Sequence, residues 1–116
     1  MKTKDHRISR SKNPKSKRYR RDMAKYLSGK PLKCVTVRDE DGVENVIGRG
    51  GDMLVREKEF SVYSSGERLF RCLVDELDAW ELLSLEGVVI TAPDLDHDGD
   101  VRTIIAYYQY WRPVES

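Results

Sequence analysis

The spacing of apolar residues changes at Pro31, from a helical period before it to a strand-like period after it. Before this proline, four apolar residues recur every three or four positions, which predicts an amphipathic helix over residues 17–28. Ser16 is suited to cap the start of this helix, and Gly29 can adopt the left-handed conformation that ends it. The apolar stripe consists of Tyr19, Met23, Tyr26 and Leu27.

After Pro31, apolar and polar residues alternate in short runs separated by Gly, Pro and Asp, a pattern typical of strands. Residues 79–85 fit either a strand or a helix. Seven or eight short strands with turn signals about every 8–12 residues predict a mainly β fold. We expect a small antiparallel β-barrel with one N-terminal amphipathic helix. The other expected strands span residues 32–38, 43–48, 53–57, 60–64, 68–74, 88–92 and 101–111.

The last expected strand is apolar on both faces, with Ile105 and Tyr107 on one face and Ile104 and Tyr108 on the other. One of these faces should line the core. The other needs a cover, and the apolar stripe of the helix is expected to provide it.

Charge divides the chain at nearly the same place as the apolar pattern. Residues 1–33 contain 13 Lys and Arg against two Asp, and the rest of the chain contains eight basic and 18 acidic residues. A segment of formal charge +11 therefore precedes one of −10. Residues 1–16 hold too few apolar side chains to form a core. We expect a flexible basic arm there (1–16), then a basic amphipathic helix (17–29) and a β domain (32–112).

The basic residues of the arm and helix form the candidate anion-binding site, because clustered Lys and Arg side chains neutralise phosphates. Nucleic acid is the favoured partner. Alternatively, the helix lies on an anionic membrane, or it docks on the acidic domain of its own chain or of a second copy, or the segment is a solubilising tail. A protein partner or a homo-oligomer is therefore also considered. The candidate residues are Lys12, Lys15, Lys17, Arg18, Arg20, Arg21 and Lys25.

A run of alternating Asp residues followed by Asp-Gly resembles the first half of a calcium-binding loop. Carboxylate oxygens suit a hard cation such as Ca²⁺, and Gly99 lies where such loops turn sharply. The twelfth loop position is Ile105 rather than a bidentate Glu, so we expect any Ca²⁺ binding to be weak. The alternative is a solvated acidic turn. The candidate ligands are Asp94, Asp96, Asp98 and Asp100.

Four aromatic residues near the C-terminus could stack on nucleic-acid bases, although large aromatic side chains on a strand more often fill or cover a core. They are Tyr107, Tyr108, Tyr110 and Trp111.

No catalytic site is predicted, and we expect a protein that is not an enzyme and has no small-molecule substrate. His6 and His97 have no Ser or Cys nucleophile beside them in the sequence. Cys34 and Cys72 form no metal-binding or redox motif. Because no apolar leader or membrane-spanning run is present, the protein is expected to be cytoplasmic, with reduced thiols.

The pattern of strands and turns from Gly48 to Trp111 resembles a bacterial pleckstrin-homology or GRAM-like domain. The residues that carry this resemblance are Gly48–Gly51 leading into Met53–Val55, Phe60–Ser64, Arg68–Leu77 and Gly87–Thr91. The resemblance implies a small β-barrel with a binding or scaffolding role. Members that bind phosphoinositides use basic residues in the loop between their first two strands, whereas this chain has the acidic residues 39–41 there. Members also close their barrel with a C-terminal helix. Here the helix is N-terminal, and plugging the barrel in place of that helix is the alternative to covering the last strand.

Overall fold

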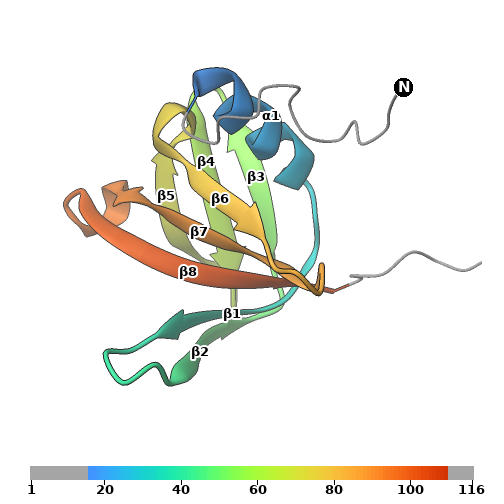
Figure 1. Cartoon of the computed structure of the whole chain (residues 1–116), viewed down its shortest axis with the longest axis vertical. Coiled ribbons are helices and arrows are strands. Elements are labelled where there is room, and N and C mark those ends of the chain that lie inside the picture. The colour runs from blue at the N-terminus through green and yellow to red at the C-terminus, as the bar shows by residue number, and fades with distance from the viewer. Residues whose placement is uncertain (1–15, 110–116) are drawn as a thin grey trace, which may run out of the picture.

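The computed structural model describes residues 16–109, which contain one helix, eight strands and two short 3₁₀ turns (Figure 1). The helix α1 spans Lys17–Leu27, and the 3₁₀ turns span Val74–Glu76 (η1) and Leu95–His97 (η2). The strands are β1 (Leu32–Arg38), β2 (Glu44–Arg49), β3 (Asp52–Arg56), β4 (Glu59–Ser64), β5 (Glu67–Leu73), β6 (Asp78–Glu81), β7 (Gly87–Asp94) and β8 (Asp100–Tyr108).

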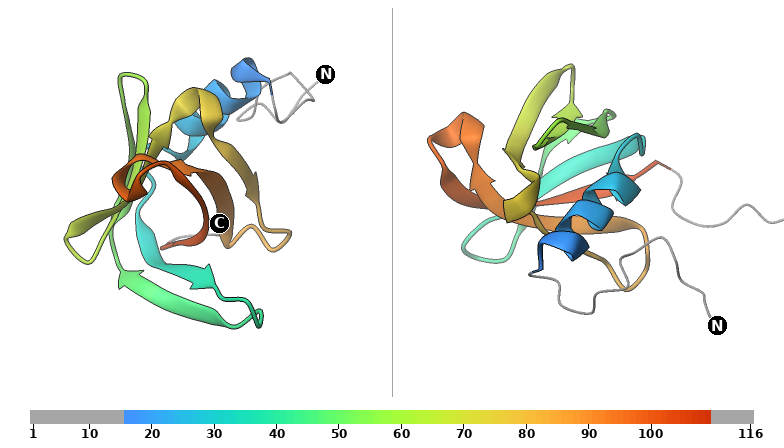
Figure 2. Two further views of the ribbon diagram at one scale, coloured as in Figure 1. Left: turned by 90° about the vertical axis from the view of Figure 1, so that its left-hand side faces the viewer. Right: turned by 90° about the horizontal axis from the view of Figure 1, so that it is seen from above.

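The strands form two antiparallel sheets, so the mainly β prediction is confirmed. One sheet has five strands in the order β2-β1-β8-β7-β6, and the other has three in the order β3-β4-β5 (Figures 1 and 2). The expected strands lie close to their predicted positions, and the ambiguous segment 79–85 contains the end of β6 followed by a turn.

The expectation of a closed barrel is wrong for the described residues, because no ladder joins the edge of β5 to the five-stranded sheet. Polar side chains of the five-stranded sheet form hydrogen bonds with the backbone of that edge instead. The Asp94 carboxylate accepts a hydrogen bond from the backbone N–H of Arg71, and Arg102 donates to the carbonyl of Leu69. The edge of β5 is therefore satisfied by polar side chains rather than by another strand.

The edge of β3 is covered by the residues that follow the helix. Ser28 Oγ accepts a hydrogen bond from the backbone N–H of Val55, and the N–H of Gly29 donates to the carbonyl of Met53. The end of α1 is thus tied directly to the three-stranded sheet.

The chain passes from β2 in one sheet to β3 in the other through a glycine corner. Gly51 has a φ of +109°, and a Cβ there would lie only 1.8 Å from the carbonyl oxygen of Tyr63. Only glycine permits this close approach of two backbones.

The predicted helix is confirmed together with its caps. Ser16 Oγ accepts a hydrogen bond from the backbone N–H of Tyr19, and Gly29 has a φ of +89°. No helix within residues 16–109 is long and apolar enough to cross a membrane.

The helix closes one end of the core between the sheets, where it packs against η1, β3 and β6. Met23 and Leu27 are fully buried there and join a core that includes Phe60 and Phe70. The face of β8 that carries Ile104 and Tyr108 also points into this core.

The helix was expected to cover the other face of β8, and that expectation is wrong. The apolar stripe is drawn into the space between the two sheets, because burial there removes more apolar surface from water than one exposed sheet face offers. In the part of the chain that the structure describes, no helix lies over the face of β8 that carries Ile105.

Candidate functional site

Arg20 and Tyr26 on the inward side of α1 fix the helix to the acidic η1–β6 segment. Arg20 donates to the backbone carbonyl of Asp75 and, at 3.1 Å, to the carboxylate of Asp78. Tyr26 Oη donates to the carboxylate of Glu81 at 2.7 Å. The Arg20 and Asp78 side chains are only 17% and 23% exposed, so this ion pair is partly shielded from solvent.

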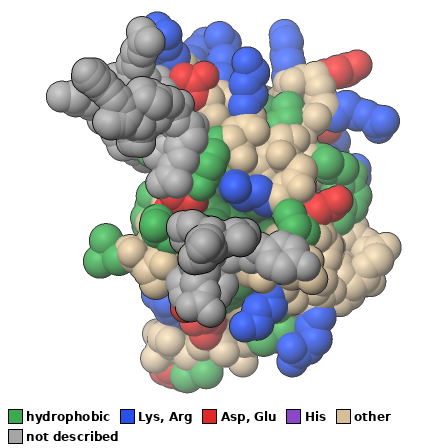
Figure 3. All heavy atoms as spheres, turned by 90° about the vertical axis from the view of Figure 1, so that its right-hand side faces the viewer, with side chains coloured by type: hydrophobic (Ala, Val, Ile, Leu, Met, Phe, Trp, Pro, Cys, Tyr) green, Lys and Arg blue, Asp and Glu red, His purple; other side chains and the backbone are tan. Residues whose placement is uncertain are grey.

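The outward side of α1 carries cations that remain exposed. Together with a lysine of the β3–β4 turn they form what we call the basic face, which consists of Lys17, Arg18, Arg21, Lys25 and Lys58. Figure 3 shows Lys and Arg side chains gathered at the top of the side of the molecule on which α1 lies.

Two adjacent hollows lie between the helix and the β3–β4 turn. One has a volume of about 470 Å³, and its lining includes the cations Arg18, Arg21 and Lys25 together with the acids Asp22 and Glu57. The other has a volume of about 300 Å³, and its lining includes Arg21 and Lys58 together with Glu57 and Asp75. The basic face is thus a concave surface with several cations around it rather than a row of charges on an isolated helix.

Asp75 lies within the basic face and is held as an anion by it. The hydrogen bond from Arg21 lowers the pKa of the Asp75 carboxyl, and the charges of Lys17 and Lys58 act in the same direction. Both side chains of the Arg21–Asp75 pair are exposed to solvent, so this ion pair contributes little to stability.

The predicted anion-binding residues therefore divide into three groups. Lys12 and Lys15 lie outside the described residues. Arg20 points inward and binds the chain's own acidic segment. The remaining four belong to the basic face, and they are Lys17, Arg18, Arg21 and Lys25.

The apolar stripe of the helix is used within the fold. Met23 and Leu27 are fully buried, and Tyr19 and Tyr26 pack against the same core. Inserting these side chains into a membrane would require the helix to leave the two sheets.

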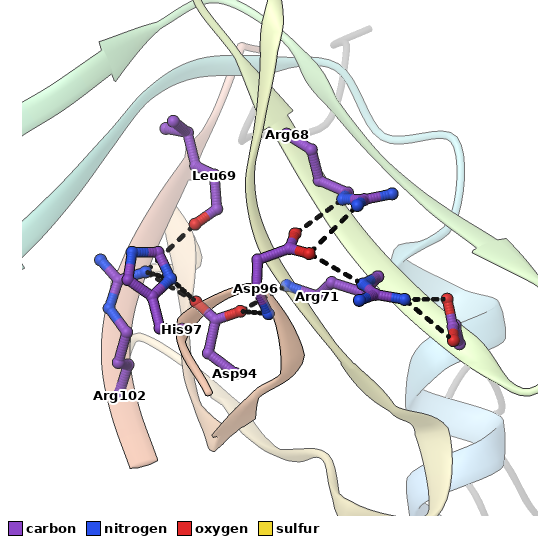
Figure 4. A network of polar contacts seen from close by, with 8 residues as sticks. Arg68, Leu69, Arg71, Asp94, Asp96, His97 and Arg102 are labelled. Carbon is purple, nitrogen blue, oxygen red and sulfur yellow. Dashed lines mark hydrogen bonds and ion pairs between the residues drawn. The ribbon is translucent and has the colours of Figure 1, made fainter. Parts of the chain in front are cut away.

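Two of the four aspartates proposed as calcium ligands are bound by basic side chains (Figure 4). Asp94 is 0% exposed and accepts hydrogen bonds from the backbone N–H of Asp96 and from the guanidinium of Arg102, the latter at 2.7 Å. His97 Nδ1 lies 2.9 Å from the same carboxylate. The Asp94 carboxylate therefore already has its partners within the fold.

Asp96 is held by two arginines of β5. Arg68 Nε lies 2.7 Å from one carboxylate oxygen and Arg71 Nε lies 3.1 Å from the other. The hydrogen bond from Arg68 lowers the pKa of Asp96, and Arg71 contributes in the same direction.

Asp98 and Asp100 are exposed on the β7–β8 hairpin. Asp98 has a φ of +57° and precedes Gly99 in the tight turn of that hairpin. Within residues 16–109 no group of three or more His, Cys, Asp or Glu side chains is arranged to hold a metal ion. Calcium binding at this loop stays a prediction.

The aromatic residues of β8 face opposite sides of the sheet. Tyr108 is buried in the core, whereas Tyr107 is on the outer face and donates a hydrogen bond to Glu44 at 2.5 Å. This bond raises the pKa of Tyr107 to about 12. These two tyrosines do not form one stacking surface, and Tyr110 and Trp111 lie outside the described residues.

The residues considered for catalysis are held apart. His6 is outside the described residues, and His97 is bonded to Asp94. Burial raises the pKa of the Cys72 thiol to about 12, which keeps it protonated and unreactive near neutral pH.

One surface was not identified from the sequence, namely the outer face of the five-stranded sheet. The paired strands place one residue each in a row across this face, from β2 to β6. We call it the outer row, and it consists of Val46, Thr36, Ile105, Val89 and Trp80. The apolar character of both faces of β8 was the signal in the sequence that pointed to it.

Comparison of the chain with protein-family models, curated proteins and solved structures gave no match. The function proposed below is therefore inferred from the charges, hollows and contacts of these surfaces alone.

Proposed function

We propose that this chain is a non-catalytic binding module that holds nucleic acid through its phosphates on the basic face. Lys12 and Lys15 precede the helix and would add contacts to the same polymer. The hollow of about 470 Å³ edged by Arg18, Arg21 and Lys25 carries this proposal. Its concave shape allows several cations to meet one phosphate backbone at once.

The docking of the helix strengthens this proposal. Because Arg20, Met23 and Leu27 hold the helix in the fold, the outward cations are kept on one side before the polymer arrives. Ordering them in advance lowers the entropy lost on binding. Among residues 16–109 no aromatic side chain lines either hollow, so we expect recognition through the phosphate backbone, independent of base sequence.

Charge reversal tests this function. We expect the variant Arg18→Glu/Lys25→Glu to lose most of its affinity for a labelled single-stranded RNA, measured by fluorescence anisotropy at several salt concentrations. The slope of log K against log salt should fall by about one for each phosphate contact removed.

The matched control is Lys33→Glu/Arg49→Glu, which makes the same change in net charge at exposed positions of β1 and β2. It should retain most of the affinity when the parent and both variants are measured at a protein concentration at which sedimentation shows all three to be monomers. Equal losses in both double variants, or no salt-dependent binding by the intact chain, would contradict the proposal.

The second candidate function is a protein-interaction module whose helix packs on its own acidic segment. The observation that favours it is the ion pair between Arg20 and Asp78 together with the buried apolar stripe. In this case the intact chain would show no affinity for RNA, and the charge-reversal variants would behave like the parent protein.

A weak Ca²⁺ site on the β7–β8 hairpin stays part of this second candidate. The exposed carboxylates of Asp98 and Asp100 support it, and the arginines on Asp94 and Asp96 weaken it. A Ca²⁺ titration followed by NMR through the amide signals of residues 94–100 tests this binding. If these signals do not shift at millimolar Ca²⁺, the hairpin does not bind the metal.

The fold type that we propose is pleckstrin-homology-like or GRAM-like. Two antiparallel sheets around one core and a helix that closes one end support this fold type. An experimental structure whose strand order differs from these two sheets would contradict the fold type.

We also place the protein in the cytoplasm, where the free thiols of Cys34 and Cys72 stay reduced.

A further inference from the structure

We propose that the outer face of the five-stranded sheet binds a second copy of this chain. This interaction goes beyond the proposed function, which uses α1 and the β3–β4 turn on another part of the molecule.

The outer row is continuous across all five strands. Trp80 pairs with Val89, Val89 with Ile105, Ile105 with Thr36, and Thr36 with Val46. Directly opposed residues of antiparallel strands point to the same face. The row therefore forms one largely apolar band on the face turned away from the core.

The band lies in a hollow. A cavity of about 400 Å³ opens on this face, and Ile105 and Thr36 in the centre of the row are only 3% and 4% exposed. At its two ends, Trp80 is 51% and Val46 is 46% exposed. Figure 2 shows the curvature of the sheet, with the β1–β2 hairpin and β6 at opposite ends.

The turn beside β6 extends the apolar surface. Leu82 lines the hollow, Leu83 is fully exposed and Leu85 is 43% exposed. An exposed tryptophan beside exposed leucines is unfavourable in water, and such patches commonly mark a surface that a partner covers.

The charges around the face fit a second copy of the same chain. The β1–β2 turn at one end of the sheet carries Asp39, Glu40 and Asp41, and the other end of the same two strands carries Lys33 and Arg49. A two-fold axis running across the strands would set the acidic end of each copy over the basic end of the other. Such self-complementarity is what a symmetric dimer requires.

The total charge also permits association. The chain has a formal net charge of +1, so two copies repel each other very little at long range. The same axis brings the two β6 strands together, which places each Trp80 near its counterpart and removes both from water.

Sedimentation velocity over a range of concentrations tests the dimer. We expect the full chain to shift from monomer to dimer as concentration rises, and Trp80→Glu to remain monomeric. The control is Leu54→Glu, which makes the same apolar-to-acidic change at a residue that is 42% exposed on the other sheet. It should dimerise like the parent. A parent chain that stays monomeric, or a Trp80→Glu variant that still dimerises, would overturn the proposal.

A second measurement does not depend on the folding of Trp80→Glu. Because the chain contains two tryptophans, Trp111→Phe leaves Trp80 as the only one. Its fluorescence should shift to the blue and resist acrylamide quenching as concentration rises. If the protein is monomeric with Trp80 already shielded, and removal of residues 110–116 exposes it, then the C-terminal segment covers this face and the proposal is wrong.

Discussion

Asp94 is the last residue of β7. Its side chain links the two sheets at the edge of β5, where no strand pairing joins them. Its buried carboxylate binds the backbone of β5 through Arg71 and the guanidinium of Arg102 on β8. A buried carboxylate is costly unless it is paired and hydrogen-bonded, and here it is both. This acidic side chain thus accepts a hydrogen bond from a backbone N–H at the edge of β5 that has no strand partner.

Asp96 extends this connection and gives it a pH dependence. Arg68 lowers the pKa of Asp96 in the folded protein. The contribution of this carboxylate to stability is therefore fully present above its unfolded pKa of about 4 and is lost as the pH falls through the lower folded value. Asp96→Asn should reduce the free energy of unfolding near neutral pH and have a smaller effect in acid.

Urea denaturation near neutral pH and at about pH 3 measures this difference. Asp100→Asn alters an exposed carboxyl of the same hairpin and is the control, with little effect expected at either pH. A destabilisation by Asp96→Asn that is equally large at both pH values would show that the carboxylate charge is not its source.

At the scale of elements, α1 has separate structural and binding sides. Leu27 is fully buried, so Leu27→Ala should lower the free energy of unfolding by about 2–5 kcal/mol. Lys25 is exposed on the opposite side, and Lys25→Ala should change stability by less than about 0.5 kcal/mol.

Chemical denaturation and RNA binding, measured on both variants, separate the two sides of the helix. Leu27→Ala should weaken folding, and Lys25→Ala should weaken RNA binding while leaving folding intact. A small effect of Leu27→Ala on stability would mean that the helix is not docked as described.

Short-range patterns predicted the elements well because they depend on neighbours in the sequence. The three-to-four-residue spacing located α1, and period-two alternation located β1 and β8 to within a few residues. The same patterns could not show which face of β8 meets the core. That choice depends on how the strands pair and on where the helix packs, and both involve residues far apart in the chain.

The aspartate loop shows the same limit for the candidate site. The spacing of Asp94, Asp96 and Asp98 matches a calcium loop, but spacing alone cannot show which counter-charges surround it. The guanidinium groups of Arg68 and Arg71 come from β5, 25 to 28 residues earlier in the chain, and both bind the Asp96 carboxylate in the fold. Long-range pairing, rather than local pattern, determines what these acids do.

At the scale of the whole molecule, the opposite charges of the two chain segments meet within one fold. Arg20 and Arg21 from the basic segment bind Asp78 and Asp75 from the acidic one. This contact orients the helix and leaves its other cations outward. The molecule thus presents a basic face at α1 and an apolar outer face on the five-stranded sheet, for which we propose nucleic acid and a second copy as the respective partners.

We propose that nucleic acid binds the helix while the helix stays docked, and NMR during a titration with single-stranded RNA tests this most directly. We predict that the amide signals of Arg18, Lys25 and Lys58 shift while the methyl signals of Met23 and Leu27 keep their positions. Methyl signals that move to unfolded positions, or shifts confined to other surfaces, would contradict it.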